Sequence, residues 1–374
     1  MENVIKILSE LVSFETYNPP GKDYDKIAYY LRDLFESIGF SVELIEIPEE
    51  YLDRNYIYSP RHKGNKRIIV LAKNNEEPLI HFNAHYDVVP AGNGWLTDPY
   101  KLKLVSDKAY GRGVSDMKGG IVSMYLALSE TKRPVEISLV PDEESGGIGT
   151  KYLTEVRKIR AKYVIIGEPS FPNIYIGHLG IIRGVIRVIG KQVHASKAKE
   201  GENAFINAAK LALEIQKIYN VKEVSLNLGG YTINSSDNDG VVPGEFAFSF
   251  YRSTLPDEKN VEDEIRSIVS KAANNVNVKY EMEVKSYVPG SFTPKDSKLV
   301  KVAEECVYRV INVLPEKIIA QIRYDGVFFR PFAEVINIGP GDNAHIPNES
   351  VSVSNIVKTS RIYGCIISTL FLRD

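Results

Sequence analysis

The chain has 374 residues, 44% of them hydrophobic, a length that suggests about two or three domains with large apolar cores. Lys and Arg together number 46 and Asp and Glu 48, so the formal net charge is −2. This near balance argues against a nucleic-acid-binding protein, which would carry a surplus of basic residues. The longest apolar runs fall short of the ~20 residues that a membrane-spanning helix needs, so no membrane partner is expected.

The first residues of the chain have an amphipathic helical pattern. Val4, Leu8 and Leu11 fall on one helical face, and Lys6 lies off it. A signal peptide would instead have a basic end followed by an apolar core. A soluble cytoplasmic protein is therefore expected.

The two cysteines, Cys306 and Cys365, lie far apart in the sequence and form no C-x-x-C pair. This spacing implies neither a disulfide framework nor a cysteine zinc site. We expect both residues to be small, buried, apolar groups.

Short apolar runs alternate with helical patterns from the start of the chain to about residue 177. Continuous apolar strands between helices are typical of an α/β sheet that is covered on both faces. These runs are residues 67–72, 78–84, 136–140 and 163–166, and after about residue 288 the pattern returns with a run at 334–338.

The middle of the chain has a different order of elements. A strand at 181–189 and a helix at 203–217 are followed by strands at 224–233 and 245–251, a helix at 257–271 and a strand at 277–285. This β-α-β-β-α-β order is that of the ferredoxin-like motif. We therefore predict an α/β domain of residues 1–178 and 288–374 with an α+β domain of residues 179–287 inserted. One continuous α/β domain is the alternative, and it fits the changed pattern less well.

Histidines and carboxylates directly follow four of the apolar runs. Because sites in open α/β sheets lie at the carboxyl ends of strands, these side chains could converge on one point. They are His85 and Asp87 after the run at 78–84, Glu143 and Glu144 after 136–140, Glu168 after 163–166 and His345 after 334–338; Asp116 adds a carboxylate just before an apolar helix at 121–128.

Two histidines and several carboxylates suit a borderline metal such as zinc. Because carboxylates can bridge, the set could hold two ions about 3.5–4 Å apart. In the pair Glu143-Glu144, one carboxylate could bind metal while its neighbour takes a proton from water. Asp87 is placed to accept the second imidazole N–H of His85, which would fix the ring's tautomer.

Each of these features also has an ordinary structural explanation when it is taken alone. Asp116 could be a helix N-cap, and Glu143-Glu144 could be part of a solvated face. His81, inside an apolar run, is expected to be a hydrogen-bonded core histidine. The repeated position of acidic residues after buried strands is what favours a metal site. Residues 111–116 lack the third glycine of a dinucleotide-binding fingerprint, and residues 113–117 lack the second glycine of a nucleophile elbow.

Five segments occur in the order found in the co-catalytic zinc amidohydrolases: NAHYDVVPAG, GRGVSDMKGG, PDEESGG, GEPS and GDNAHIPNE. This family includes acetylornithine deacetylase, succinyl-diaminopimelate desuccinylase, aminoacylase and glutamate carboxypeptidase, and the resemblance covers essentially the whole chain. It implies a zinc-peptidase-like catalytic domain with an inserted lid that also forms a homodimer. It further implies two Zn²⁺ per subunit, with Co²⁺ as a substitute.

The resemblance implies a role for each residue of the cluster. His85 and Glu168 would hold one zinc ion, Glu144 and His345 would hold the other, and Asp116 would bridge them. Glu143 resembles the general base of the family, and Asp87 the carboxylate that orients the first histidine.

Three lid residues resemble substrate-binding residues of the family. His194 matches the histidine that reaches into the partner subunit's site and donates a hydrogen bond to the oxyanion. Arg252 matches the arginine that grips a substrate carboxylate, a role that suits a planar bidentate donor. Asn238 resembles the lid asparagine, although it stands two residues before the usual position, which Gly240 occupies.

The sequence departs from the family pattern around these lid residues. Phe250 stands where the family usually has aspartate, and Gly240 where it usually has asparagine. His178-Leu179 stands where desuccinylases often carry paired arginines. The resemblance implies metal-dependent hydrolysis of the amide bond of an N-acyl amino acid. The departures leave the substrate open and count against a simple desuccinylase. A carboxypeptidase or dipeptidase acting on short peptides is one alternative, and a non-catalytic metal-binding dimer is another.

Overall fold

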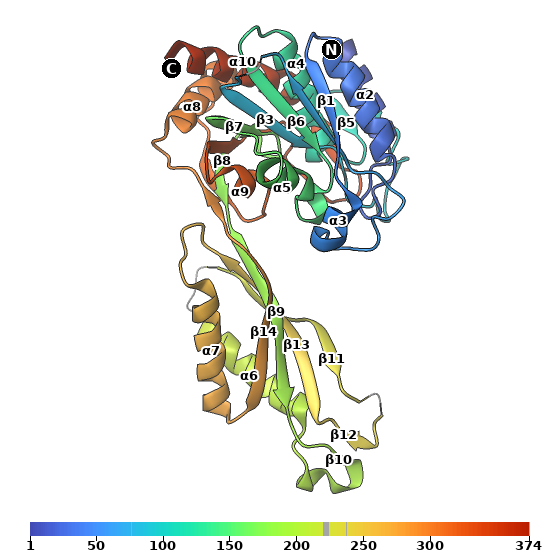
Figure 1. The fold of residues 1–374 in the computed structure, drawn as a ribbon, viewed down its shortest axis with the longest axis vertical. Coiled ribbons are helices and arrows are strands. Elements are labelled where there is room, and N and C mark those ends of the chain that lie inside the picture. Colours follow the sequence, from blue (N-terminus) through green and yellow to red (C-terminus); the bar gives the residue numbers. More distant parts are fainter. Residues whose placement is uncertain (76, 220–223, 237, 374) are drawn as a thin grey trace. The chain divides into compact units, whose positions relative to one another are not determined.

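The structure is a computed structural model that describes residues 1–75, 77–219, 224–236 and 238–373. The chain forms two compact units, Met1–Gly177 with Phe292–Asp374 (the first unit) and His178–Ser291 (the inserted unit). The junctions lie at 177/178 and 291/292, where the sequence predicted 178/179 and 287/288. The predicted class, an α/β fold with an inserted α+β domain, is confirmed (Figure 1).

Nine strands among the described residues form the sheet of the first unit, in the order β1-β2-β6-β3-β7-β17-β8-β15 with β16 beside β8. The central strands β6, β3, β7 and β17 run parallel to one another. The strands are β1 (Ser41–Glu46), β2 (Ile68–Lys73), β3 (Ile80–His85), β6 (Val135–Val140), β7 (Tyr163–Ile166), β8 (Ile174–His178), β15 (Ser291–Phe292), β16 (Lys317–Ala320) and β17 (Glu334–Asn337). The five predicted strands are present, with ends shifted by at most two residues.

Helices cover both faces of this sheet (Figure 1). The main apolar cluster joins one face to α1 (Glu2–Ser13), α2 (Tyr24–Glu36), α4 (Gly119–Ser129), α8 (Lys298–Ile311) and α10 (Val353–Arg373). Two smaller clusters join the other face to α3 (Glu49–Asn55), α5 (Ile148–Glu155) and α9 (Gly326–Phe329). Strands β3, β6 and β7 are buried at every position, which explains why they read as continuous apolar runs.

His81 on β3 is buried, as predicted, and its two ring nitrogens lie 2.7 Å from Glu136 Oε1 and 2.7 Å from Ser138 Oγ. A separate small sheet of β4 (Lys103–Val105), β5 (Lys108–Tyr110) and β18 (Ser350–Ser352) has the strand order β18-β5-β4. No helix among the described residues is long and apolar enough to cross a membrane.

The larger sheet of the inserted unit is antiparallel and has the strand order β11-β13-β9-β14. Its elements follow the predicted order: β9 (Gly180–Ile189), α6 (Ala204–Tyr219), β11 (Leu226–Asn234), β13 (Glu245–Thr254), α7 (Val261–Val276) and β14 (Lys279–Val288). Both helices pack on one face, against alternate residues such as Ile186 and Phe250. Between these elements lie β10 (Val193–His194), the short helix η3 (Ala195–Glu200) and β12 (Val241–Val242).

The prediction for the cysteines was wrong, because Cys306 on α8 and Cys365 on α10 form a disulfide. Their Cα atoms lie 5.7 Å apart, a separation typical of disulfides. Their spacing in the sequence gave no sign of this pairing, since it depends on α8 and α10 packing side by side in the folded chain.

Candidate metal centre

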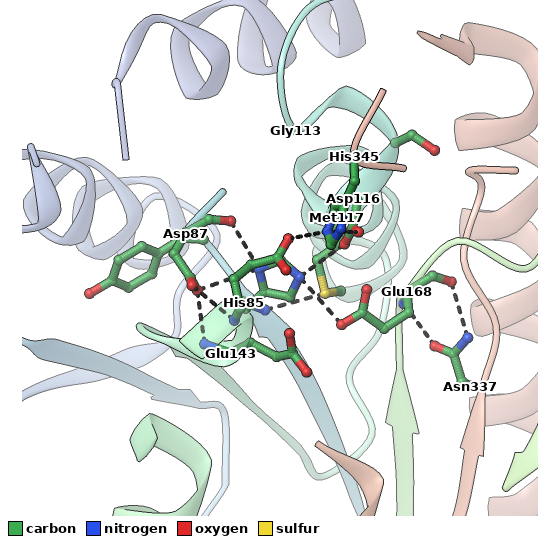
Figure 2. Close-up of polar contacts among 12 residues, drawn as sticks. His85, Asp87, Gly113, Asp116, Met117, Glu143, Glu168, Asn337 and His345 are labelled. Carbon is green, nitrogen blue, oxygen red and sulfur yellow. Dashed lines mark hydrogen bonds and ion pairs between the residues drawn. The ribbon is translucent and has the colours of Figure 1, made fainter. Parts of the chain in front are cut away.

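The ends of the central strands bring the predicted cluster together (Figure 2). His85 is the last residue of β3, and Glu168 follows β7 by two residues. Glu143 and Glu144 lie in the short helix η2 (Glu143–Ser145), which begins three residues after the end of β6. Because β3, β6 and β7 are parallel neighbours, their carboxyl ends meet at one edge of the sheet.

Two further segments complete the cluster. Asp116 lies in η1 (Val114–Lys118), immediately before α4, and the peptide bond between Asp116 and Met117 is cis. His345 lies in the loop that follows β17, with the left-handed backbone angle φ 60°.

The side chains form two groups that share Asp116. In the first, His85 Nε2 lies 3.0 Å from Asp116 Oδ1 and 3.3 Å from Glu168 Oε1. In the second, His345 Nε2 lies 2.8 Å from Glu144 Oε1 and 3.3 Å from Asp116 Oδ2. One carboxylate thus offers one oxygen to each group, which is the arrangement that a bridging ligand needs. All five residues predicted as metal ligands lie in these groups.

The charges of this cluster fit a cation. Burial, followed by repulsion from Asp116, raises the pKa of Glu144 to about 7. Hydrogen bonds to Asp116 and Glu144 raise the pKa of His345 to about 10. Three carboxylates are crowded together with only imidazole protons to balance them. A divalent ion in each group would relieve this repulsion, and imidazole nitrogens with carboxylate oxygens are suitable donors for zinc.

Asp87 connects the first histidine to the Glu143-Glu144 pair. His85 Nδ1 lies 2.9 Å from the backbone carbonyl oxygen of Asp87, whereas the Asp87 carboxylate is 3.5 Å away. That carboxylate instead accepts the backbone N–H groups of Glu143 and Glu144, at 3.2 and 3.1 Å. The sequence predicted a bond from the imidazole to the carboxylate, but the backbone carbonyl of Asp87 is the closer acceptor.

The carboxylate of Glu143 has no hydrogen-bond partner among the described residues, and in Figure 2 it points toward the region of His85 and Glu168. Burial, followed by repulsion from Glu168, raises the pKa of Glu143 well above its usual range. A carboxylate in this place is free to exchange a proton with a reacting molecule.

Sequence reasoning gave no role to Asp142, which precedes this pair. Its buried carboxylate accepts hydrogen bonds from Asn18 Nδ2 at 2.7 Å, Tyr24 Oη at 2.9 Å and Arg67 Nε at 3.0 Å. Its backbone is left-handed, with φ 63°. These contacts fix the turn that leads from β6 into η2. The only sequence signal was its position next to Glu143.

Asn337, the last residue of β17, was also missed. Its side chain brackets the backbone of Glu168: Oδ1 accepts the N–H at 2.7 Å, and Nδ2 donates to the carbonyl oxygen at 3.1 Å (Figure 2). A polar residue inside an apolar run was the signal that could have identified it.

The three lid residues have partners within the inserted unit. His194 is exposed, and its Nδ1 accepts the N–H of Ser196 at 3.2 Å. Asn238 is exposed, and its Oδ1 accepts the N–H of Gly240 at 2.8 Å. Their substrate-binding roles stay predictions.

Arg252, on β13, is fully buried next to Tyr219 of α6 and Glu264 of α7. Its guanidinium forms ion pairs with Glu258 and with Glu264, the latter at 2.8 Å. Both ion pairs use Nη2, while Nε and Nη1 have no hydrogen-bond partner among the described residues. The predicted role of Arg252 also stays a prediction.

Comparisons with known proteins extend over the whole chain. Residues 81–369 match the family described as Peptidase family M20/M25/M40. A succinyl-diaminopimelate desuccinylase of Nautilia profundicola is 27% identical over 391 residues, covering 98% of this chain and 99% of that protein.

Solved structures share the complete fold. The aminopeptidase PepT of Bacillus cereus has a TM-score of 0.79 at 20% identity, covering 99% of this chain and 98% of that one. A Bacillus subtilis protein described as a dinuclear metal binding peptidase has a TM-score of 0.72 at 13% identity, covering 100% of this chain and 98% of that one. The resemblance predicted from five sequence segments is confirmed, and with it the expectation of a metal-dependent amidohydrolase. With more than half of its length matched by the family, this chain belongs to peptidase family M20/M25/M40.

Proposed function

We propose that this chain hydrolyses the amide bond of a small N-acyl amino acid at a pair of zinc ions. The observation that carries the proposal is the sharing of Asp116 between two groups of ligands, with the unpaired carboxylate of Glu143 beside them. Its curated relatives, named succinyl-diaminopimelate desuccinylase, support a deacylase.

His85, Asp116 and Glu168 would hold one ion, and Asp116, Glu144 and His345 would hold the other. A bound zinc pair supplies Lewis acidity, which polarises a carbonyl group and makes water more acidic. Cobalt, which accepts the same nitrogen and oxygen donors, would substitute for zinc.

Glu143 would act as general base and acid. It would take a proton from the attacking water and return it to the leaving amine. Asp87 supports this role by holding the backbone N–H groups of Glu143 and Glu144, so the base and its neighbouring ligand keep a fixed spacing. Through its carbonyl oxygen, Asp87 also holds the ring of His85.

We further propose that the chain forms a homodimer through the inserted unit. His194 would then donate a hydrogen bond to the oxyanion in the partner subunit's site, while Arg252 and Asn238 would bind the substrate. The exposure of His194 and of Asn238 supports this assignment, whereas Arg252 is buried and would first have to become accessible to the substrate.

We propose a cytoplasmic location from the amphipathic helical pattern of the N-terminal segment. The amphipathic N-terminal segment is a helix, α1, that packs in the core of the first unit. The disulfide is unusual for the cytosol of most organisms but frequent in intracellular proteins of hyperthermophiles.

Peptide hydrolysis is the second candidate, because proteins named as peptidases share the complete fold. To separate the two, amine release is measured from a panel of N-acetyl amino acids, N-succinyl amino acids and dipeptides, with zinc or with a chelator. We expect chelator-sensitive release from N-acyl amino acids. Faster cleavage of dipeptides would favour the peptidase, and turnover that a chelator leaves unchanged would refute the metal centre.

The role of Glu143 is tested with Glu143→Ala. The variant should lose turnover by a factor of about 10²–10⁴, the usual contribution of a general base, and should still bind zinc. Its matched control is Glu136→Gln, a change at a buried glutamate on the opposite end of β6. A Glu143→Ala enzyme with near-normal rate would refute the assigned base.

A further inference from the structure

Glu349 is a buried carboxylate that the proposed reaction does not use. It lies four residues after His345 and immediately before β18, and 1% of its surface is exposed. It accepts four hydrogen bonds. Its Oε1 accepts the backbone N–H groups of Ser115 at 2.8 Å and Asp116 at 3.1 Å. Its Oε2 accepts the N–H of Gly113 at 3.1 Å and Arg112 Nη1 at 2.7 Å.

The loop before α4 is folded around this carboxylate. Three backbone N–H groups within four residues point at it, which is the geometry of an anion-binding nest. Gly113 makes this possible through a left-handed backbone, φ 82°, and a Cβ added there would lie 2.5 Å from Val88 Cγ1. Only glycine fits the turn without a shift of its neighbour.

Glu349 is itself held from two sides. Its carbonyl oxygen accepts the N–H of Gly111 at 3.1 Å, and the adjoining strand β18 pairs with β5. Arg112 is buried, donates to Ala91 O at 3.1 Å and stacks over Trp95 at 5.2 Å from the ring centroid. The carboxylate of Glu349 is therefore held in a fixed position, and it in turn fixes the loop before α4.

We infer that Glu349 is a positioning residue: it fixes the place of the bridging carboxylate of Asp116 relative to the histidine His345. The segment of residues 345–349 begins with His345, and at its other end the carboxylate of Glu349 accepts the backbone N–H of Asp116. The inference rests on the proposed metal centre. Hydrogen bonds to a charged acceptor are roughly twice as strong as neutral ones. Removing the charge of Glu349 should therefore weaken its hold on the loop before α4, while a side chain of similar size leaves no cavity.

A merely structural role gives a different expectation. If Glu349 only stabilised the fold, its loss would lower the melting temperature of the metal-free protein and leave zinc affinity unchanged. If it positions Asp116, zinc affinity falls as well, because groups that orient metal ligands typically contribute a factor of about 10–100. Zinc affinity of the folded protein therefore separates the two roles.

The test compares zinc binding by the wild type, Glu349→Gln and Glu136→Gln. The last is a matched control, because Glu136 is also buried but contacts His81 at the far end of the sheet. Zinc affinity is measured by competition with a chromophoric chelator, and circular dichroism reports the folding of each metal-free protein. We expect Glu349→Gln to bind zinc about 10- to 100-fold more weakly and Glu136→Gln to stay within threefold of the wild type.

An affinity of Glu349→Gln within threefold of the wild type would overturn the inference. If that variant does not fold, Glu349→Asp is measured in its place, since it keeps the charge and shortens the reach. It should bind zinc at least threefold more weakly, and wild-type affinity would again overturn the inference. A wild type that binds no zinc would instead refute the proposed function, so the two failures can be told apart.

Discussion

The disulfide between α8 and α10 should contribute a large share of the stability of the first unit. The bridge joins residues separated by 59 positions. In the chain-entropy treatment, closing a loop of that length stabilises the folded state by about 4 kcal/mol at 25 °C. Unfolding of the roughly 260 residues of the first unit carries about 0.5 kcal/mol of entropy per kelvin. Loss of the bridge should therefore lower Tm by about 8 °C.

The perturbation is Cys306→Ser combined with Cys365→Ser. Serine nearly preserves the side-chain size, so the double substitution removes the bridge with little change in packing. Tm is measured by scanning calorimetry with and without dithiothreitol. The reductant should lower the Tm of the wild type by the same amount and leave the double variant unchanged.

The reasoning would be refuted by a wild-type Tm that neither the reductant nor the double substitution moves by more than about 2 °C, well below the shift expected from loop closure. Thiol titration of the denatured protein provides the control. The wild type should have no reactive thiol before reduction and two afterwards.

Further predictions concern a close backbone contact, a helix cap and metal removal. Gly120→Ala should cost about 1–3 kcal/mol by overpacking and weaken zinc binding, because its Cβ would lie 2.4 Å from Gly167 O. In Gly364→Ala, with nothing within 4 Å of the new atom, stability should be kept or raised; equal effects of the two changes in thermal melts would contradict this. Ser297→Ala should cost about 1 kcal/mol in urea unfolding, since its Oγ caps α8; an unchanged unfolding midpoint would count against the cap. Removing zinc should lower Tm, and restoring it at about 100 times Kd should add about 2.7 kcal/mol; a Tm indifferent to zinc would contradict the metal centre.

The positions of His85 and Glu168 could be predicted because the strands before them are buried on both faces. Such strands read as apolar runs, and parallel neighbours bring their ends to one edge. The supporting residues could not be found in this way. Glu349 acts through backbone N–H groups of a loop 233–236 positions away in the sequence, and no local periodicity reports such a contact.

The burial of Arg252 could have been predicted from strand periodicity alone. Side chains alternate between the two faces of a strand, so Arg252 shares a face with Phe248 and Phe250. Both phenylalanines belong to the apolar cluster formed with α6 and α7. Family resemblance pointed to Arg252 as a substrate ligand, while the strand pattern indicated a side chain held under α6 and α7.

The place of β17 in the sheet has a consequence for the synthesis of the chain. This strand pairs with β7 in the interior of the sheet, yet residues 167–333, which include the inserted unit, lie between the two strands in the sequence. At roughly 5–20 residues per second, a ribosome needs on the order of 10–30 s to cover that distance. Throughout this interval one side of β7 has no partner strand, and an open strand edge invites pairing with other chains. His345 follows β17 in the chain and emerges later still, so the second group of ligands is the last part of the cluster to be synthesised.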